Sequence, residues 1–379
     1  MKELEIYIHI PFCIRKCAYC DFLSGPTSEA EREKYIKLLC EEIRLAKDRT
    51  DQYTVSTIFF GGGTPSILTV EQMKQIMSAV RDTFQLSDDA EISMEMNPGT
   101  VTLEKLKGYK EAGINRLSIG LQSTIDSELK NLGRIHTYEE FLESYQEART
   151  AGYKNINIDL MSAIPGQNIE SWKTSLLRIM ELNPEHISAY SLIVEPGTLF
   201  YEKYGEDGKT DPGIPQLPDE EEERQMYYLT KEIMKEYGYH RYEISNYAKE
   251  GYECRHNKGY WRRVPYLGFG VGAATLFEKT RYTNPSTIDE YQKCFMNKYE
   301  GERLTVKDEM EEFMFLGLRM MEGISKRDFK DLFHKEYDDV YGEVTRKFLE
   351  EGFLKEEEGR IALTDRGIDV SNMIFVEFM

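Results

Sequence analysis

The sequence predicts an α/β fold, in which an open, partial (β/α)6 barrel is followed by a small winged-helix-like α+β domain. Two observations predict this arrangement. From residue 4 to residue 195, short β-rich apolar stretches alternate with amphipathic helical patterns, as they do in repeated βα units. Beyond residue 304, three helical patterns precede two short strands joined at Glu358-Gly359, and these are the parts of a winged helix.

The barrel strands are expected in the apolar stretches, and the helices between them carry start and stop signals. Ser28 and Thr69 each open a capping box, with Glu or Gln three residues later. Gly113 and Gly152 stand where a helix ends in a residue of positive φ. Because parallel barrel strands end at one mouth, groups that follow the strands should converge there. The predicted strands are residues 4–10, 57–60, 91–96, 116–121, 155–160 and 186–193.

Three regions are expected along the chain. Residues 1–195 form the barrel core, residues 196–304 an extension that closes its open side, and residues 305–379 the winged-helix-like domain. A loop rich in Gly and Pro at 195–218 marks the first change of pattern. The predicted wing carries glutamate at 356, 357 and 358, so we expect it to contact protein or to cover a substrate, not to bind DNA.

The net charge limits the kinds of binding partner, and the cysteine content indicates the cellular compartment. The formal net charge is −19 without a compensating basic cluster, which argues against a nucleic-acid partner. The chain has no apolar run of 18 residues and enters a strand-like segment at once, without a signal peptide. Its six cysteines show no regular disulfide framework. We therefore expect a cytoplasmic protein.

A cysteine motif follows the first predicted strand. Cys13, Cys17 and Cys20 have the spacing C-x3-C-x2-C. Three thiolates can hold three irons of a [4Fe–4S] cube, and the fourth iron then stays open for a chelating molecule such as S-adenosylmethionine (SAM). A structural zinc site is the alternative, although zinc sites usually include a second ligand pair. The remaining cysteines stand singly: Cys40, Cys254 and Cys294.

With its flanks, the motif resembles the HemN/HemW branch of the radical SAM superfamily. The flanks are Tyr-Ile-His-Ile-Pro-Phe-Cys at 7–13 and Asp-Phe at 21–22. The branch contains oxygen-independent coproporphyrinogen III dehydrogenases and related heme chaperones, and the resemblance extends from residue 1 to about residue 370. It implies a radical SAM barrel, a [4Fe–4S] cluster on the three cysteines, and one-electron reduction of SAM to methionine and a deoxyadenosyl radical.

The resemblance also implies which residues bind SAM. Gly62, Gly63 and Thr64 follow the second strand, where consecutive glycines let a ligand approach the backbone; a plain turn is the alternative. Glu95 ends the third strand, where a carboxylate can accept both ribose hydroxyls, unless it is a solvated strand-end charge. Asp159 lies among buried residue types, so we expect a balancing partner such as Arg134, or a ligand. The implied SAM residues are Tyr7, Tyr19, Gly62, Gly63, Thr64, Glu95, Gln122, Arg134 and Asp159.

A second segment, residues 255–261, matches the pattern H-N-x-x-Y-W that is characteristic of the heme-chaperone members. A neutral imidazole is a common axial ligand of heme iron, and Tyr and Trp can supply a flat apolar wall. The alternative is a histidine that is buried and satisfied by neighbouring groups. The heme-binding candidates are His256, Asn257, Tyr260 and Trp261.

Two departures separate this chain from the dehydrogenases. Those proteins have a fourth cysteine two residues after the third, where this chain has Phe22, and an extension before the motif, where this chain has twelve residues. The resemblance therefore implies a chaperone that carries heme to acceptor hemoproteins, including acceptors at the membrane surface. Decarboxylation of coproporphyrinogen III and radical degradation of heme are the alternatives. The resemblance does not decide whether one or two SAM molecules bind, or whether the protein is a monomer or a dimer.

Overall fold

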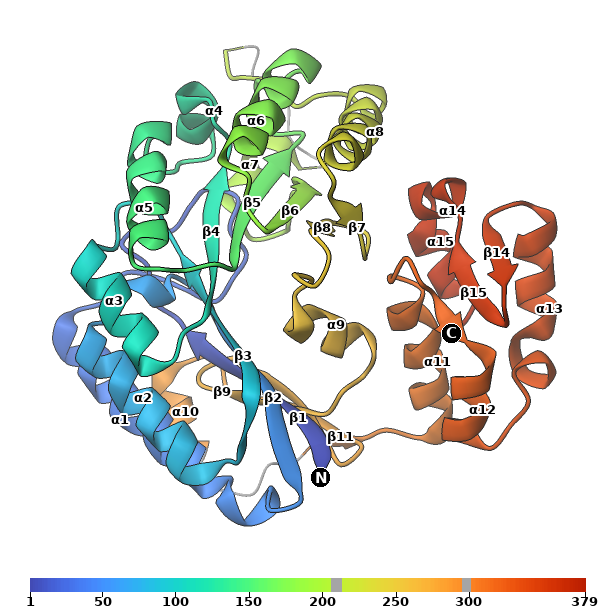
Figure 1. The fold of residues 1–379 in the computed structure, drawn as a ribbon, viewed down its shortest axis with the longest axis horizontal. Helices are drawn as coiled ribbons and strands as arrows, with labels where there is room; N and C mark the ends of the chain where they lie inside the picture. Colours follow the sequence, from blue (N-terminus) through green and yellow to red (C-terminus); the bar gives the residue numbers. More distant parts are fainter. Residues whose placement is uncertain (206–212, 295–300) are drawn as a thin grey trace.

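The computed structural model describes residues 1–205, 213–294 and 301–379 (Figure 1). Its main element is a twelve-stranded sheet with the order β12-β11-β10-β9-β1-β2-β3-β4-β5-β6-β8-β7. The six central strands lie in sequence order and run parallel. The predicted partial (β/α)6 barrel is therefore confirmed.

The barrel strands extend further than their apolar cores. They are β1 (Lys2–Ile10), β2 (Tyr53–Gly62), β3 (Leu86–Met96), β4 (Arg116–Gln122), β5 (Ile156–Ser162) and β6 (His186–Ser191). Strand β2 begins before the predicted residue 57 because its pairing with β1 continues down to Lys2 opposite Tyr53. The N-terminal end of β2 is therefore set by backbone pairing, which cannot be predicted from the apolar pattern.

The barrel helices cover the outer face of the sheet (Figure 1). They are α1 (Glu29–Leu45), α2 (Val70–Thr83), α3 (Leu103–Ala112), α4 (Asp126–Asn131), α5 (Tyr138–Thr150) and α6 (Ile169–Leu182). The capping boxes predicted at Ser28 and Thr69 are both present, and Gly113 ends α3 with φ of 114°. None of the described helices has the length and apolar character needed to cross a membrane.

The extension adds strands to both edges of the barrel sheet. On the β6 side lie β8 (Asn246–Ala248) and β7 (His240–Arg241), both in antiparallel pairs. On the β1 side lie β9 (Tyr266–Phe269), β10 (Ala274–Phe277), β11 (Thr280–Thr283) and β12 (Glu302–Arg303). Its helices are α7 (Leu199–Tyr204), α8 (Glu220–Glu236), α9 (Arg255–Trp261) and α10 (Ile288–Cys294). Helix α9 lies on the open, inner side of the sheet (Figure 1), and part of the predicted loop at 195–218 lies outside the described residues.

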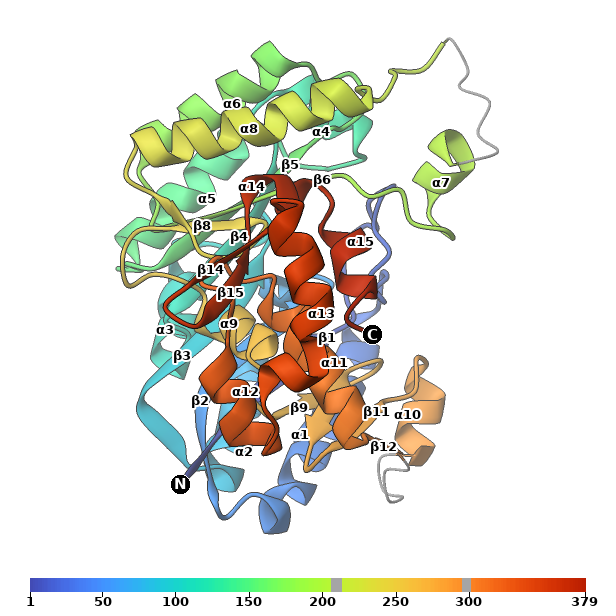
Figure 2. The same ribbon diagram turned by 90° about the vertical axis from the view of Figure 1, so that its right-hand side faces the viewer.

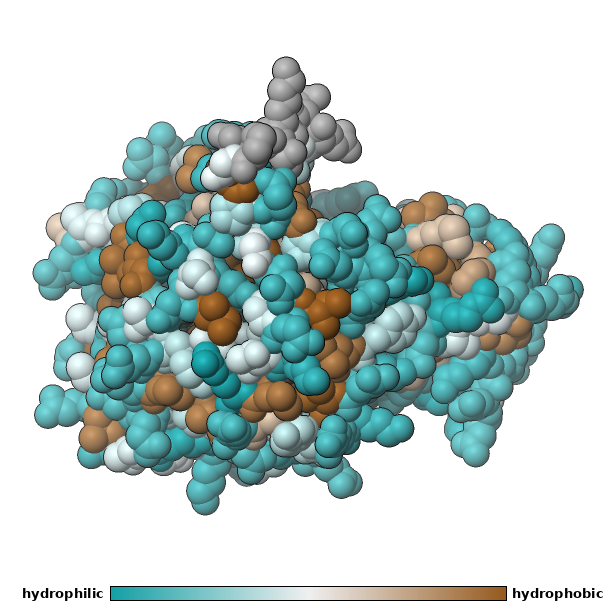
Figure 3. All heavy atoms as spheres, turned by 90° about the horizontal axis from the view of Figure 1, so that it is seen from above, coloured by the Kyte–Doolittle hydropathy of each residue, from teal (hydrophilic) through white to brown (hydrophobic). Residues whose placement is uncertain are grey.

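The C-terminal part forms a separate lobe with its own core, which includes Phe329, Tyr337 and Phe348. It contains α11 (Val306–Gly317), β13 (Ile324–Ser325), α12 (Lys326–Phe333), α13 (Tyr337–Glu350), β14 (Leu354–Glu357), β15 (Arg360–Leu363), α14 (Asp365–Asp369) and α15 (Ser371–Val376). The lobe lies in front of the open side of the barrel (Figure 2) and projects from the larger body when seen from above (Figure 3). The predicted helices and hairpin of a winged helix are present, whereas the domain boundaries at 195 and 304 stay a prediction.

Candidate functional site

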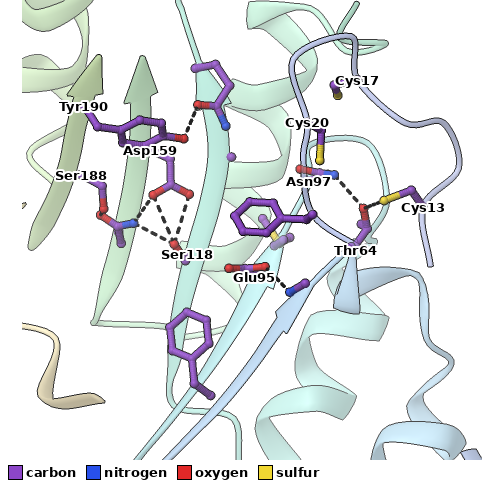
Figure 4. Close-up of a pocket in the computed structure, with 18 of the residues that line it drawn as sticks. Cys13, Cys17, Cys20, Thr64, Glu95, Asn97, Ser118, Asp159, Ser188 and Tyr190 are labelled. Carbon is purple, nitrogen blue, oxygen red and sulfur yellow. Dashed lines mark hydrogen bonds between the residues drawn. The ribbon is translucent and has the colours of Figure 1, made fainter. Parts of the chain in front are cut away.

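The segment after β1 brings the three cysteines to the carboxyl ends of the barrel strands. Two backbone hydrogen bonds close the loop: the Cys13 N–H donates to the Gly25 carbonyl (2.9 Å), and the Gly25 N–H donates to the Pro11 carbonyl (3.1 Å). A third bond, from the Ala18 N–H to the Leu132 carbonyl (3.2 Å), ties the loop to the end of α4. The three thiols are free and line one cavity of about 400 Å³ (Figure 4).

Hydrogen-bond donors approach two of the sulfur atoms. The Thr64 hydroxyl donates to Cys13 Sγ at 3.4 Å, and Arg134 Nη1 donates to Cys17 Sγ at 3.6 Å. The thiolate is the form of cysteine that binds iron. The three thiols on this wall of the cavity supply the ligands for three iron–thiolate bonds.

The glycine turn after β2 lies against the cysteine loop and leaves no room for a side chain. The Thr64 N–H donates to the Phe12 carbonyl at 2.7 Å. A Cβ atom at Gly63 would stand 2.6 Å from the same carbonyl oxygen, and Gly62 adopts a φ of +110°. The Gly62 N–H donates to Glu95 Oε2 at 3.0 Å, so the turn also connects the loop to β3.

Two partly buried carboxyl groups line the cavity, Glu95 on β3 and Asp159 on β5 (Figure 4). Burial and the nearby charge of Asp159 raise the pKa of Glu95 to about 8. Burial also raises the pKa of Asp159, although Asn157 Nδ2 at 2.7 Å and Ser118 Oγ at 3.2 Å donate to its oxygens. Glu95 therefore favours the neutral form near pH 7, because burial disfavours a carboxylate, whereas the charge of Arg116 opposes the rise in the pKa of Asp159.

Of the two expected ways to balance Asp159, the pairing with Arg134 is absent, and a ligand stays a prediction. The Arg134 guanidinium instead donates to Asn97 Oδ1 at 2.9 Å and to the Gly120 carbonyl, besides the sulfur of Cys17. Arg134 follows α4, and its side chain therefore faces the cysteine loop. Asp159 is held by neutral groups of its own strand and of β4.

The remaining residues expected around SAM also line the cavity. Gln122 ends β4 with φ of 76°, and its Oε1 accepts a hydrogen bond from the Tyr190 hydroxyl at 3.0 Å. The Tyr7 hydroxyl lies 3.0 Å from His9 Nδ1, and Tyr19 stands within the cysteine loop itself. The structure thus brings all nine predicted SAM residues to one cavity together with the three cysteines.

His256, the first heme candidate, is buried beneath aromatic rings. It is 1% exposed, and its Nδ1 lies 2.7 Å from the Thr57 hydroxyl of β2. Its ring stacks on Phe59 with 5.2 Å between centroids and meets Tyr260 edge-on at 4.7 Å. Burial and the charge of Arg116 lower the pKa of His256 to about 3, and its Nε2 has no hydrogen-bond partner. The imidazole is therefore neutral, with a free nitrogen.

The four heme candidates do not share one surface. His256, Asn257 and Tyr260 line the cavity that also holds the cysteines. Trp261 instead lines a groove of about 500 Å³ between α9 and the C-terminal lobe, where the Arg319 guanidinium lies 4.5 Å from its ring centroid.

Comparison with known proteins gives the family. Residues 7–179 match the radical SAM superfamily, and residues 304–370 match the HemN C-terminal domain. The chain is 37% identical over 378 residues to the heme chaperone HemW of Bacillus subtilis (strain 168), with 98% of each chain covered. The chain belongs to the HemW family of radical SAM proteins. The HemW of Escherichia coli (strain K12) is 36% identical over 334 residues, which cover 87% of this chain and 86% of that one.

A solved structure supports the fold of this HemW-family chain. Coproporphyrinogen III oxidase (HemN) of Escherichia coli, a radical SAM enzyme, aligns with a TM-score of 0.85 at 23% identity. The alignment covers 100% of this chain and 90% of that chain. At this identity the likeness shows the fold alone.

Membership of the radical SAM superfamily implies a [4Fe–4S] cluster and SAM, and the cavity of this HemW-family chain fits both. Three free thiols line one wall, and the turn of Gly62, Gly63 and Thr64 lines the cavity beside them. When bound, the cluster supplies the electron that reduces SAM. The protein contributes the thiols, the backbone of the glycine turn and the polar side chains of the cavity wall.

Several polar residues of the cavity were missed by sequence reasoning. They include inward-facing residues of β4, β5 and β6, where a strand points alternate side chains to the same face. The signal was present, because polar residues recur at every second position, as in Asn157 and Asp159. The missed polar residues include Asn97, Arg116, Ser118, Asn157, Ser188, Tyr190 and Asn246.

Glu5 on β1 is a further buried acid beside His256. Its side chain is 1% exposed, and Oε2 lies 3.9 Å from His256 Nδ1 without a hydrogen-bond partner. Burial raises the pKa of Glu5 to about 9. The carboxyl group is therefore protonated in the folded protein at neutral pH.

We expect Glu5→Gln to flatten the pH dependence of stability on the alkaline side. The folded pKa lies above the unfolded one, so the native state binds more protons between these values, and the free energy of unfolding falls as the pH rises. The slope from one such group is at most about 1.4 kcal/mol per pH unit. Urea unfolding at several pH values from about 5 to about 9 measures it. Glu33→Gln, at an exposed position of α1, should keep the wild-type slope; an equal slope in Glu5→Gln would contradict the prediction.

Proposed function

We propose that this protein is a heme chaperone that binds heme, delivers it to acceptor hemoproteins, and uses SAM bound to a [4Fe–4S] cluster. The observation that carries the proposal is one cavity in which three free thiols and a buried, neutral imidazole with a free nitrogen are both found. The names of the HemW relatives support the same function. Free cysteines are maintained in a reducing compartment, which supports a cytoplasmic location.

In this proposal the cluster and SAM bind in the part of the cavity at the carboxyl ends of the barrel strands. Cys13, Cys17 and Cys20 would bind three irons of the cluster, and the fourth iron would stay open to SAM. Gly62, Gly63 and Thr64 offer backbone groups to the amino acid part of SAM, and Glu95 accepts the ribose hydroxyls. Tyr7, Tyr19, Gln122, Arg134 and Asp159 complete the contacts.

In the same proposal, His256 is the axial ligand of heme iron through Nε2. Its lowered pKa keeps the ring neutral, and in the tautomer in which Nδ1–H donates to the Thr57 hydroxyl, Nε2 carries the lone pair that binds iron. Asn257 and Tyr260 lie beside it on the cavity wall. Trp261 is left out of this contact set, because its ring lies in the groove on the other side of α9.

An anaerobic heme titration followed at the Soret band tests the function. Wild-type protein should bind heme saturably, and His256→Ala should bind at least about tenfold more weakly, because an iron–imidazole bond is lost. His136→Ala is the matched control: His136 is also buried and bonds a backbone carbonyl, that of Leu121, so heme affinity should not change. Absence of saturable binding to the wild type would overturn the proposal.

Oxidative decarboxylation of coproporphyrinogen III is the second candidate, and the HemN-like fold is the observation that favours it. The reconstituted protein should be incubated with that substrate, SAM and a reductant, and the products analysed. Conversion of coproporphyrinogen would establish the enzyme and contradict the chaperone. Loss of the Soret band of bound heme together with SAM consumption would instead indicate heme degradation.

A further inference from the structure

The cavity has a second chemical centre at a distance from the cysteines. Arg116 is the first residue of β4 and lines the cavity, whereas the cysteine loop stands at the carboxyl ends of the strands. Because parallel strands run from one end of the barrel to the other, Arg116 lies toward the opposite end. The cavity therefore joins the metal-binding mouth to an inner, cationic end.

Arg116 is buried and forms no ion pair with a described residue, although Cys254, Glu91 and Asp159 lie near enough for their charges to offset the effect of burial on its pKa. It is 2% exposed, its Nη1 makes one long hydrogen bond of 3.5 Å to Ser93 Oγ, and its Nε has no partner. None of the ion pairs between described residues includes it. A buried guanidinium ion is poorly solvated unless a carboxylate or a similar anion pairs with it. Its donors are thus available to a ligand.

The neighbouring carboxyl groups do not replace that partner. Glu91 Oε1 accepts the N–H groups of Arg255 (3.0 Å) and His256 (3.3 Å) at the start of α9. Asp159 is bonded to neutral groups, and burial keeps its pKa raised, as it does that of Glu95. Neither Glu91 nor Asp159 forms an ion pair with the guanidinium, whose printed hydrogen bond is the long one to Ser93.

Other unpaired atoms line the same cavity near Arg116. His256 Nε2 and Asn246 Oδ1 have no hydrogen-bond partner, and both residues line the cavity wall. The charge of Arg116 lowers the pKa of His256, which places the guanidinium within electrostatic reach of the imidazole. Because Arg116 and His256 line one cavity of about 400 Å³, a ligand bound at His256 can extend a side arm toward Arg116.

We propose that Arg116 is a carboxylate-binding residue, which pairs with an acidic arm of the molecule that occupies the inner end of the cavity. The planar guanidinium can donate two parallel hydrogen bonds to a carboxylate. The inference rests on the proposed function, under which the acidic arm is a propionate of heme. The carboxylate of SAM is the other source of the same chemistry.

The test compares heme with its dimethyl ester, in which both propionates are neutral. We expect wild-type protein to bind heme about tenfold or more tightly than the ester, the range of one hydrogen bond to a charged group. Arg116→Gln should bind heme and the ester equally, with the affinity that the wild-type protein has for the ester. Arg262→Gln is the control, because Arg262 is an exposed arginine of the outer groove that pairs with Glu322, and it should keep the wild-type preference.

Each result decides the question. Equal binding of heme and ester by the wild type, or a preference that persists in Arg116→Gln, would overturn the role of Arg116 and leave the chaperone intact. If Arg262→Gln loses the preference for heme over the ester, the propionates bind in the outer groove, and the role of Arg116 is again overturned. If Arg116→Gln loses SAM binding but still prefers heme over the ester, the carboxylate that Arg116 binds is that of SAM. No saturable heme binding by the wild type would overturn both proposals.

The comparison does not depend on one variant. The wild-type preference is measured without any substitution, and Arg116→Lys keeps the charge while removing the planar fork. We expect Arg116→Lys to keep part of the preference. Circular dichroism and cluster content identify a variant that fails to fold.

Discussion

A Cys17→Ala variant is expected to retain less than about a tenth of the wild-type cluster after anaerobic reconstitution. The variant leaves two thiols in the loop, and two protein ligands do not hold a [4Fe–4S] cube. The other cysteines whose side chains are described, Cys40 and Cys254, are buried elsewhere and do not line the cavity. Iron and acid-labile sulfide content, with visible absorbance, measure the loss. SAM binding should fall with it, because the open iron is lost.

Cys40→Ala is the matched control for this experiment. Cys40 is buried in α1, within the apolar core of the barrel, so its loss should weaken packing modestly and leave cluster content unchanged. Retention of the cluster by Cys17→Ala would contradict its role as a ligand. Equal loss of the cluster in Cys17→Ala and Cys40→Ala would mean that cluster content follows the stability of the fold and not a specific ligand.

A Gly63→Ala variant should lose both cluster and SAM binding while the rest of the barrel stays folded. The new Cβ atom would stand 2.6 Å from the Phe12 carbonyl oxygen and 2.8 Å from the Phe12 nitrogen. Both atoms belong to the backbone, so the cysteine loop itself must move. Overpacking of this kind costs about 1–3 kcal/mol, and the displacement reaches Cys13, the next residue along the chain.

Gly25→Ala separates this effect from the general loss of a glycine. Gly25 closes the same loop, but a Cβ atom there would meet nothing within 4 Å. It should keep the wild-type iron content and the wild-type midpoint of urea unfolding. Full cluster loading of Gly63→Ala would show that the loop tolerates the displacement, and the glycine turn would then have no role in positioning the cysteines.

Local patterns predicted the parts of the site that neighbouring residues build. The spacing of the three cysteines, the glycines after β2 and the acid at the end of β3 all follow strands whose apolar cores are visible in the sequence. Once those strands are parallel neighbours, their carboxyl ends must meet at one mouth. The family resemblance added the residues of later strands, which also line the cavity.

Contacts between distant segments were beyond the reach of local patterns. The segment H-N-x-x-Y-W predicts one aromatic wall, yet residues four apart share a helix face and the next residue turns about 100° away. His256 and Tyr260 therefore face the cavity, whereas Trp261 faces the C-terminal lobe. The sequence does not state which face of α9 lies inside, because that depends on its packing against β2.

The sequence by itself determined the cofactor chemistry and the family, because both depend on residues close together in the chain whose spacing is preserved in any fold. Tertiary structure alone decided how the buried charges are balanced. It placed Arg134 beside Cys17 instead of Asp159, Thr57 beside His256, and Arg116 in the cavity without an ion pair between described residues. Such pairings join strands and helices that are up to 199 residues apart, and packing of the whole barrel selects them.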